Sequence, residues 1–159
     1  MEQRPAKRVS DSLTEQMQIL MPQASNGENR LFGGQLMQWI DIVAAVTARR
    51  HCNCNVTTAV VDSLQFIAPV HMNSTVVLVG RITYVGNTSM EVRVDTYVET
   101  LSGERNVVNT AYFVMVALDQ EDCPVTVPSL ILETEEEKAE WDAGEKRNAL
   151  RKKRREEKY

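Results

Sequence analysis

One carboxylate, Asp41, stands in an otherwise apolar stretch that follows a pair of glycines and runs to about Arg50. This stretch has no polar stripe wide enough to face water, which predicts a helix that is buried nearly all round. An unpaired carboxylate is costly to bury, so Asp41 should lie inside the protein or at a subunit interface, where it could act as a general base. The alternative is a structural carboxylate that pairs with an arginine or caps a neighbour.

The glycine pair Gly33-Gly34 opens this predicted helix. The first turn of a helix has free backbone N–H groups and the positive end of the helix dipole, and glycine lets a ligand approach the backbone closely. We therefore predict the amide of Gly34, with that of Gly33 beside it, as a donor to a developing oxyanion. A plain hinge between loop and helix is the alternative.

The segments around this helix read mainly as strands. Partial alternation predicts a short strand within Ser10–Met21, ended by Pro22. After the helix, β-branched and alternating segments joined by short turns predict four strands, over residues 56–66, 74–85, 90–100 and 105–118. Residues 133–159 form a charged, helix-favouring tail with acids first and bases second, and Trp141 and Leu150 could anchor it.

These elements predict an α+β fold in which a curved antiparallel sheet wraps one long central helix, the arrangement called the hotdog fold. A single sheet of this kind leaves an edge strand and one side of the helix open, so we expect at least a dimer. The expected organisation is a flexible N-terminus over residues 1–9, a hotdog domain over residues 10–130 and the charged helical tail over residues 131–159.

Composition narrows the class of protein. The 159 residues suit one domain, and the formal net charge of −4 gives no support to nucleic-acid binding. Three cysteines suggest a reducing compartment, and the absence of a signal-like start or a long apolar run predicts a cytoplasmic protein that does not enter membranes. The segment from His51 to Cys54 lacks a second Cys/His pair at zinc spacing, so we expect no metal.

Several residues together resemble a known family, the hotdog-fold acyl-CoA thioesterases or acyl-CoA hydrolases, which has cytosolic brain-type and small bacterial members. Asn26 stands seven positions before Gly33, and Asp41 stands seven positions after Gly34. The resemblance covers roughly residues 13–153 and includes further short motifs: Ala48-Arg49-Arg50-His51, Val61-Asp62 with Phe66 and Pro69-Val70, Asn87-Thr88-Ser89-Met90, and Val127-Pro128 with Glu133-Thr134-Glu135-Glu136-Glu137-Lys138.

Family members often have glycine where this chain has Asn29. Asparagine is the non-glycine residue that most readily adopts positive φ, so we expect the loop to keep its shape. The change leaves two candidate asparagines, and the spacing to the glycine pair favours Asn26.

The resemblance implies hydrolysis of a fatty acyl-CoA to the free acid and coenzyme A, with coenzyme A as part of the substrate and no other cofactor. It implies that Asn26 and the glycines of one protomer act with Asp41 of another, in a dimer or trimer of dimers. A helix rises about 1.5 Å per residue, so Asp41 is roughly 10 Å from the glycines of its own chain. Asp41 would be the general base, or less favourably a nucleophile, and Asn26 would orient the water or the thioester.

Coenzyme A also needs contacts for its nucleotide. The turn Asn87-Thr88-Ser89 resembles the family's nucleotide-contacting loop, although an ordinary hairpin turn is nearly as good a reading. Arg49, Arg50, Arg81 and the bases of the tail could supply positive charge, and the sequence does not choose among them.

Three other functions remain open from the sequence. A hydratase or dehydratase of the same fold usually needs a histidine on the central helix, and here the first is His51 at its end. A non-catalytic, regulatory acyl-CoA-binding module and an RNA-binding tail are the others. The basic cluster Arg151–Arg155 is more typical of a solvated helix end.

Overall fold

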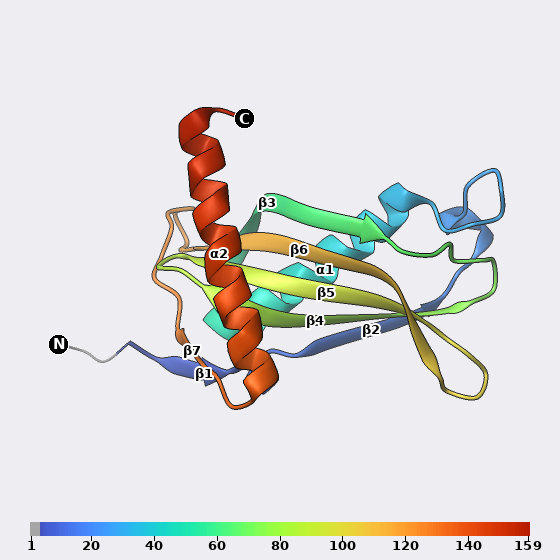
Figure 1. The fold of residues 1–159 in the computed structure, drawn as a ribbon, viewed down its shortest axis with the longest axis horizontal. Coiled ribbons are helices and arrows are strands. Elements are labelled where there is room, and N and C mark those ends of the chain that lie inside the picture. The colour runs from blue at the N-terminus through green and yellow to red at the C-terminus, as the bar shows by residue number, and fades with distance from the viewer. Residues whose placement is uncertain (1–3) are drawn as a thin grey trace.

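A five-stranded antiparallel sheet curves around one long helix in the computed structural model, which describes residues 4–159 (Figure 1). The helix α1 spans Gly33–Cys52, and the sheet order is β2-β4-β5-β6-β3, with β2 Thr14–Ile19, β3 Asn55–Phe66, β4 Thr75–Val85, β5 Ser89–Glu99 and β6 Arg105–Leu118. The predicted α+β hotdog fold is confirmed. Within residues 4–159, no helix combines the length and apolar character that crossing a lipid bilayer requires.

Helix α1 buries one face against the concave side of the sheet. Its buried residues recur at helical spacing: Leu36, Ile40, Val43, Ala44, Thr47, Ala48 and His51. The helix passes closest to β4 at Gly80, where an added Cβ would lie 2.6 Å from the Thr47 hydroxyl oxygen. On the other side Met37 and Ile42 remain 41% and 47% exposed, so α1 is not buried all round within one chain, as expected for a single sheet.

Strand β3 forms one edge of the sheet and pairs with β6 alone. Its register with β6 shifts between Thr58 and Val60 and again between Val61 and Ser63, so the strand bulges twice. Because each bulge adds one residue to the strand, the side chains after it no longer follow a simple in-and-out alternation.

The expectation of a flexible segment over residues 1–9 is wrong for residues 6–8; residues 1–3 lie outside the described part. Strand β1, Ala6–Arg8, pairs in parallel with β7, Ser129–Ile131. The Lys7 ammonium donates to the Arg50 carbonyl and the Asn53 side chain, at the C-terminal end of α1. Strands this short show no periodicity from which they could be predicted.

His51 lies in the last turn of α1. Its side chain is buried, and Nε2 lies 2.9 Å from the Pro128 carbonyl oxygen. Burial lowers the pKa of His51, although the bond to Pro128 opposes the shift. The imidazole is therefore neutral at pH 7, and Arg49 and Arg50, both exposed, carry the charge there.

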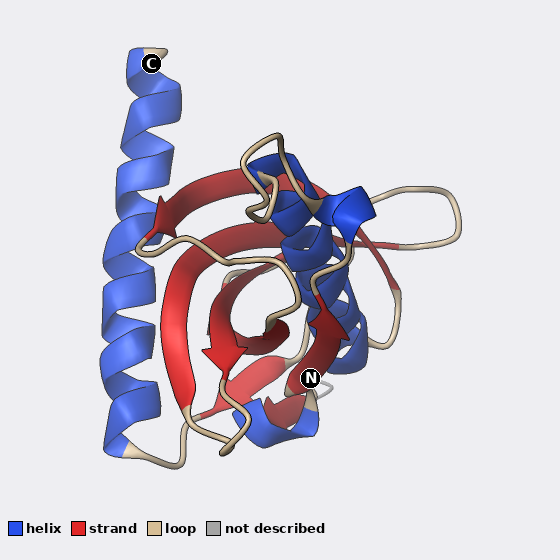
Figure 2. Cartoon of the chain, turned by 90° about the vertical axis from the view of Figure 1, so that its right-hand side faces the viewer, coloured by secondary structure: helices blue, strands red, loops and turns tan. Residues whose placement is uncertain are grey.

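The charged tail forms helix α2, Glu135–Glu157, which lies across the convex face of the sheet, opposite α1 (Figure 2). Trp141 packs on Tyr84 with ring centroids 4.5 Å apart. At Gly144 an added Cβ would meet the Tyr84 Cβ at 2.6 Å, so only glycine permits this close approach. Leu150 is 57% exposed, so the prediction that it anchors the helix is wrong.

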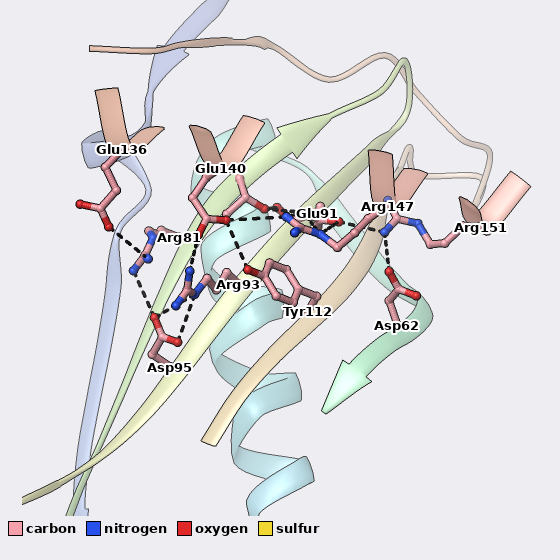
Figure 3. Close-up of polar contacts among 11 residues, drawn as sticks. Asp62, Arg81, Glu91, Arg93, Asp95, Tyr112, Glu136, Glu140, Arg147 and Arg151 are labelled. Atoms are coloured by element: carbon pink, nitrogen blue, oxygen red, sulfur yellow. Dashed lines mark hydrogen bonds and ion pairs between the residues drawn. The ribbon is translucent and has the colours of Figure 1, made fainter. Parts of the chain in front are cut away.

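Ion pairs attach the rest of α2 to the sheet (Figure 3). The Glu91 side chain is fully buried and accepts hydrogen bonds from Arg147, Arg151 and the Thr83 hydroxyl. Asp62 accepts from Arg151 at 2.8 Å and Arg154 at 2.7 Å. A second group joins the sheet's arginines to acids of the sheet and of α2: Arg81–Asp95, Arg81–Glu136, Arg93–Asp95 and Arg93–Glu140.

Glu91 is the centre of the first group, and its ionisation depends on these contacts. Burial opposes the charge, but the hydrogen bonds from Arg147, Arg151 and Thr83 outweigh it and hold the pKa of Glu91 below its ordinary value. A carboxylate with a depressed pKa in the folded state stabilises the fold above its unfolded pKa. That contribution is lost as the pH falls through the folded value.

Replacing Glu91 with glutamine should therefore lower the free energy of unfolding by about 3 kcal/mol, because two arginines lose a buried counter-charge. Urea unfolding at pH 7 measures the loss. The difference in unfolding free energy between the variant and wild type should shrink as the pH falls below the usual range of carboxyl pKa values, because Glu91 then becomes protonated in wild type. The control is Glu135→Gln, which removes the exposed partner of Lys138 and should change little; equal losses in the two variants would contradict the assignment.

Candidate active site

Asp41 lies at the border between the buried and open faces of α1 and is partly buried. Its Oδ1 accepts a hydrogen bond from the Thr58 hydroxyl at 2.6 Å. Thr58 belongs to the edge strand β3 and immediately precedes the first bulge. The partner of the carboxylate is thus a neutral hydroxyl and not the arginine that a structural role would favour, and it occupies one carboxylate oxygen.

The amides of Gly33 and Gly34 lie in the first turn of α1. The helix begins after Phe32, which makes no side-chain cap, and the Phe32 carbonyl accepts from the Leu36 N–H at 3.1 Å. The amides of Gly33 and Gly34 precede that first intrahelical bond, so the helix itself gives them no acceptor. A Cβ at Gly34 would lie 2.7 Å from the Phe32 ring, so a larger residue here would displace that exposed side chain.

The loop before the helix fixes the orientation of Asn26. Its Oδ1 accepts from the backbone N–H groups of Glu28 at 2.9 Å and Arg30 at 3.2 Å. These two bonds identify the oxygen and leave the Nδ2 group, a donor, free of the loop's own bonds. Asn29 adopts φ +58°, the conformation expected where relatives have glycine. Asn26 is exposed and can therefore donate to a bound group.

A hollow of about 330 Å³ lies beside this loop and the start of α1. Asn26 and Arg30 form one wall, and Leu36 of α1 and Phe66 at the end of β3 contribute apolar surface. Asp41 is not among its lining residues. One chain therefore brings Asn26 to the glycine end of the helix and Asp41 to Thr58, about 10 Å apart along the helix, and does not bring the two sets together.

The turn Asn87-Thr88-Ser89 lies in a different place, between the ends of β4 and β5, where it faces the C-terminal half of α2. The turn and α2 enclose a hollow of about 520 Å³. Its basic lining residues all belong to the tail: Arg151, Lys152, Arg154 and Arg155. Two of the other candidates serve the fold, because Arg50 donates to the Leu13 carbonyl and Arg81 pairs with Asp95.

Two of the three thiols lie side by side at the end of α1. The Cys52 and Cys54 sulfurs lie 3.1 Å apart as free thiols, and burial raises the pKa of Cys52 to about 11. In the part of the chain that the structure describes, no three His, Cys, Asp or Glu side chains converge as metal ligands. Cys123, in the loop after β6, is exposed.

Thr58 is a site residue that the sequence analysis missed. It is the second of two adjacent threonines in a strand rich in β-branched residues. Threonine is common in strands, so nothing in the residue type marks this position as special. The bulge after Thr58 has no residue signature that identifies it beforehand. The only available signal was position, since a strand that follows the central helix must lie against it.

Comparison with known proteins gives this geometry a context. A model of the thioesterase superfamily matches residues 28–102. The chain is 43% identical over 119 residues to YkhA of Bacillus subtilis, an uncharacterized acyl-CoA thioester hydrolase, covering 74% of this chain and 69% of that one. It is 34% identical to the cytosolic acyl coenzyme A thioester hydrolase of Rattus norvegicus, covering 87% of this chain but only 37% of the rat protein.

Solved structures are similar over nearly the whole chain. An acyl-CoA hydrolase of Staphylococcus aureus, in complex with butyryl coenzyme A, coenzyme A and coenzyme A disulfide, superposes with a TM-score of 0.92 at 34% identity, covering 97% of this chain and 94% of that one. An apo-hexameric acyl-CoA thioesterase superposes with a TM-score of 0.90 at 36% identity, covering 94% and 97%.

The Staphylococcus aureus protein has also been solved as three alanine variants, of an asparagine, an aspartate and a threonine. These three residues have the same spacing in that sequence as Asn26, Asp41 and Thr58 have here.

The positive φ of Asn29 gives a test of the loop that carries Asn26. Asn29→Gly should leave the free energy of unfolding nearly unchanged, whereas Asn29→Val should lower it by about 1–2 kcal/mol, because a β-branched residue is strained in this conformation. Urea unfolding measures both. Asn106→Val, at an exposed position of β6, is the matched control, and an Asn29→Val variant as stable as that control would refute the strain argument.

Proposed function

This chain belongs to the hotdog thioesterase superfamily and is an acyl-CoA thioester hydrolase, and from that premise we propose that it cleaves fatty acyl-CoA with Asp41 as the general base. The observation that carries the proposal is the hydrogen bond from Thr58 to Asp41, 2.6 Å long, at the open side of α1. It holds one carboxylate oxygen in place and leaves the other for a water molecule.

We infer that the working unit is a homo-oligomer, at least a dimer. The open face of α1 carries Met37 and Ile42, and β3 presents a free edge, so a second copy can cover both. A facing helix from that copy would set its own Gly34 and Asn26 near this chain's Asp41, which one chain cannot do. Hexameric relatives support a trimer of dimers.

The proposed reaction is direct hydrolysis. Asp41 accepts a proton from water as the water oxygen attacks the thioester carbonyl carbon, and the carbonyl oxygen becomes an oxyanion. The amide of Gly34, with Gly33, and the Nδ2 group of the same protomer's Asn26 donate to that oxyanion. The carbon–sulfur bond then breaks, and the coenzyme A thiolate takes the proton from Asp41, which regenerates the carboxylate.

Asn26 is better suited to this donor role than to accepting a hydrogen bond from water, because its side-chain oxygen already accepts two hydrogen bonds within the loop. A hydratase or dehydratase on this scaffold is disfavoured, since the histidine of α1 is buried and bonded to Pro128. We extend the proposal to a cytoplasmic location, as for the rat relative named cytosolic.

Replacing Asp41 tests the proposal directly. Asp41→Asn keeps the shape and removes the base, so kcat on a panel of fatty acyl-CoAs should fall at least about 10²-fold, in an assay of thiol release. Coenzyme A binding should persist. Asp142→Asn, on the exposed side of α2, is the control for charge and should retain activity. If Asp41→Asn keeps wild-type kcat, the mechanism is wrong; if wild type binds but hydrolyses nothing, the chain is a binding module.

The role of Thr58 is separable. Thr58→Val removes the hydroxyl at similar volume and should lower kcat about tenfold or more with little change in KM, because a hydrogen bond to a charged group is lost. Thr58→Ser keeps the hydroxyl and should stay near wild type. Steady-state measurement of kcat and KM on one acyl-CoA tests this. Equal losses of kcat in the valine and serine variants would contradict a catalytic contribution from the hydrogen bond.

A further inference from the structure

We propose that Cys52 and Cys54 form a dithiol site that low-molecular-weight disulfides, such as oxidised glutathione, convert reversibly to an intramolecular disulfide. The two cysteines flank Asn53 in the short connection between α1 and β3. The site therefore joins along the chain the two elements that the Thr58–Asp41 hydrogen bond brings together in space. Disulfide formation here does not depend on the proposed hydrolysis.

The two sulfurs of the pair are already in contact. The Cys54 thiol donates a hydrogen bond to the Cys52 sulfur at 3.1 Å, and the Cys52 thiol donates to the Cys54 carbonyl oxygen at 3.6 Å. Both are free thiols and both are partly exposed. A disulfide bond is about 2.05 Å long, so the sulfurs need to approach by only about 1 Å to form it.

Asn53 sets this geometry. It is the C-cap of α1 and adopts the left-handed conformation, with φ +55°. Its N–H donates to the Arg49 carbonyl at 2.8 Å, and its side-chain oxygen accepts from the Lys7 ammonium at 3.0 Å. Because this conformation mirrors that of a right-handed helix, the Cα atoms of residues 52 and 54 are roughly 5.4 Å apart. Disulfides usually span such a separation, so the bond can form with little movement of the backbone.

The pair has too few neighbouring ligands to hold a metal ion. His51 precedes Cys52 in the chain, but its side chain is buried and its Nε2 lies 2.9 Å from the Pro128 carbonyl oxygen. Among residues 4–159, no three His, Cys, Asp or Glu side chains converge as metal ligands. Two adjacent thiols without further ligands are suited to thiol–disulfide exchange, and disulfides that form in reducing compartments are mostly transient or redox-sensing.

A small disulfide reaches Cys54 before Cys52. Cys54 lines a hollow of about 450 Å³ at the C-terminal end of α1, together with Arg49 and Asp119, whereas Cys52 is not among its lining residues. Burial, together with the hydrogen bond from Cys54, also raises the pKa of the Cys52 thiol to about 11. Since the thiolate is the attacking species, Cys54 makes the first attack and Cys52 resolves the mixed disulfide.

The exchange proceeds in two balanced steps. The Cys54 thiol loses its proton to water, and its thiolate attacks one sulfur of the disulfide RSSR; the S–S bond breaks, and the released RS⁻ takes up a proton to give RSH. The Cys52 thiol then loses its proton and its sulfur attacks the Cys54 sulfur of the mixed disulfide, which releases the second RSH. The protein dithiol is oxidised and the small disulfide is reduced to two thiols. The fixed contact between the sulfurs favours this second, intramolecular attack.

The test equilibrates the whole chain in a glutathione redox buffer, blocks the free thiols with N-ethylmaleimide in urea and digests the protein with trypsin. Cleavage after Arg50 and Arg81 releases residues 51–81, which contain both cysteines of the pair and no other. In that peptide, mass spectrometry should find the internal disulfide, without maleimide or glutathione, at least about tenfold in excess over the mixed disulfide. Treatment with dithiothreitol before blocking should return the peptide to the form that carries two maleimides.

Cys123 is the internal control, because it is exposed and lies in a different tryptic peptide; it should form only the mixed disulfide with glutathione. Cys52→Ser should stop at a lasting mixed disulfide on Cys54, and Cys54→Ser should take up glutathione at least about tenfold more slowly than Cys52→Ser. Equilibration of wild type in urea should reduce the excess of internal over mixed disulfide, because the geometry at Asn53 is lost.

Three results would each overturn the proposal. In the first, residues 51–81 keep two free thiols while Cys123 carries glutathione. In the second, wild type accumulates the mixed disulfide on Cys52 or Cys54. In the third, the excess of the internal disulfide is the same in urea as in the folded protein, so that the fold contributes nothing to the site.

Discussion

Helix α1 can bury only one of its faces in the curve of a single sheet, and the site follows from that constraint. The buried face packs on β4, β5 and β6, with Gly80 allowing the closest contact. The other face stays apolar and open, with Met37 and Ile42 on it. Asp41 lies on the border between the two, where one of its carboxylate oxygens accepts a hydrogen bond from Thr58.

The second helix, α2, is held on the sheet mainly by ion pairs and not by apolar packing. Trp141 packs against Tyr84, Gly144 allows a close approach, and Arg147 lies over the Tyr112 ring, but most of the helix's other contacts are ion pairs with a fully buried glutamate at their centre. A buried carboxylate is tolerable only when its partners are well placed, so the network demands one position of α2 on the sheet. That single position also determines where the last basic side chains of the helix lie, beside the turn between β4 and β5.

Much of the fold was predictable because its signals repeat along the chain. Strand β6 has the predicted bounds, and the glycine-led helix and the positive φ of Asn29 follow from residue type alone. The bulges of β3 were not predictable, so alternation could not identify Thr58 as the residue that faces Asp41. The burial of Glu91 was not predictable from its own strand, because it depends on a helix more than forty residues later in the chain.

The thiols differ in a way that is useful in the laboratory. Cys52 is partly buried with a raised pKa, and Cys54 lies against it, whereas Cys123 is exposed on a loop whose backbone is anchored by Asp119. A maleimide reagent reacts with accessible thiolates, so a fluorophore should attach to Cys123 first. The same loop continues to Val127, which is bonded to Asn87. A fluorophore on Cys123 would therefore report on changes in the loop that joins β6 to the turn between β4 and β5.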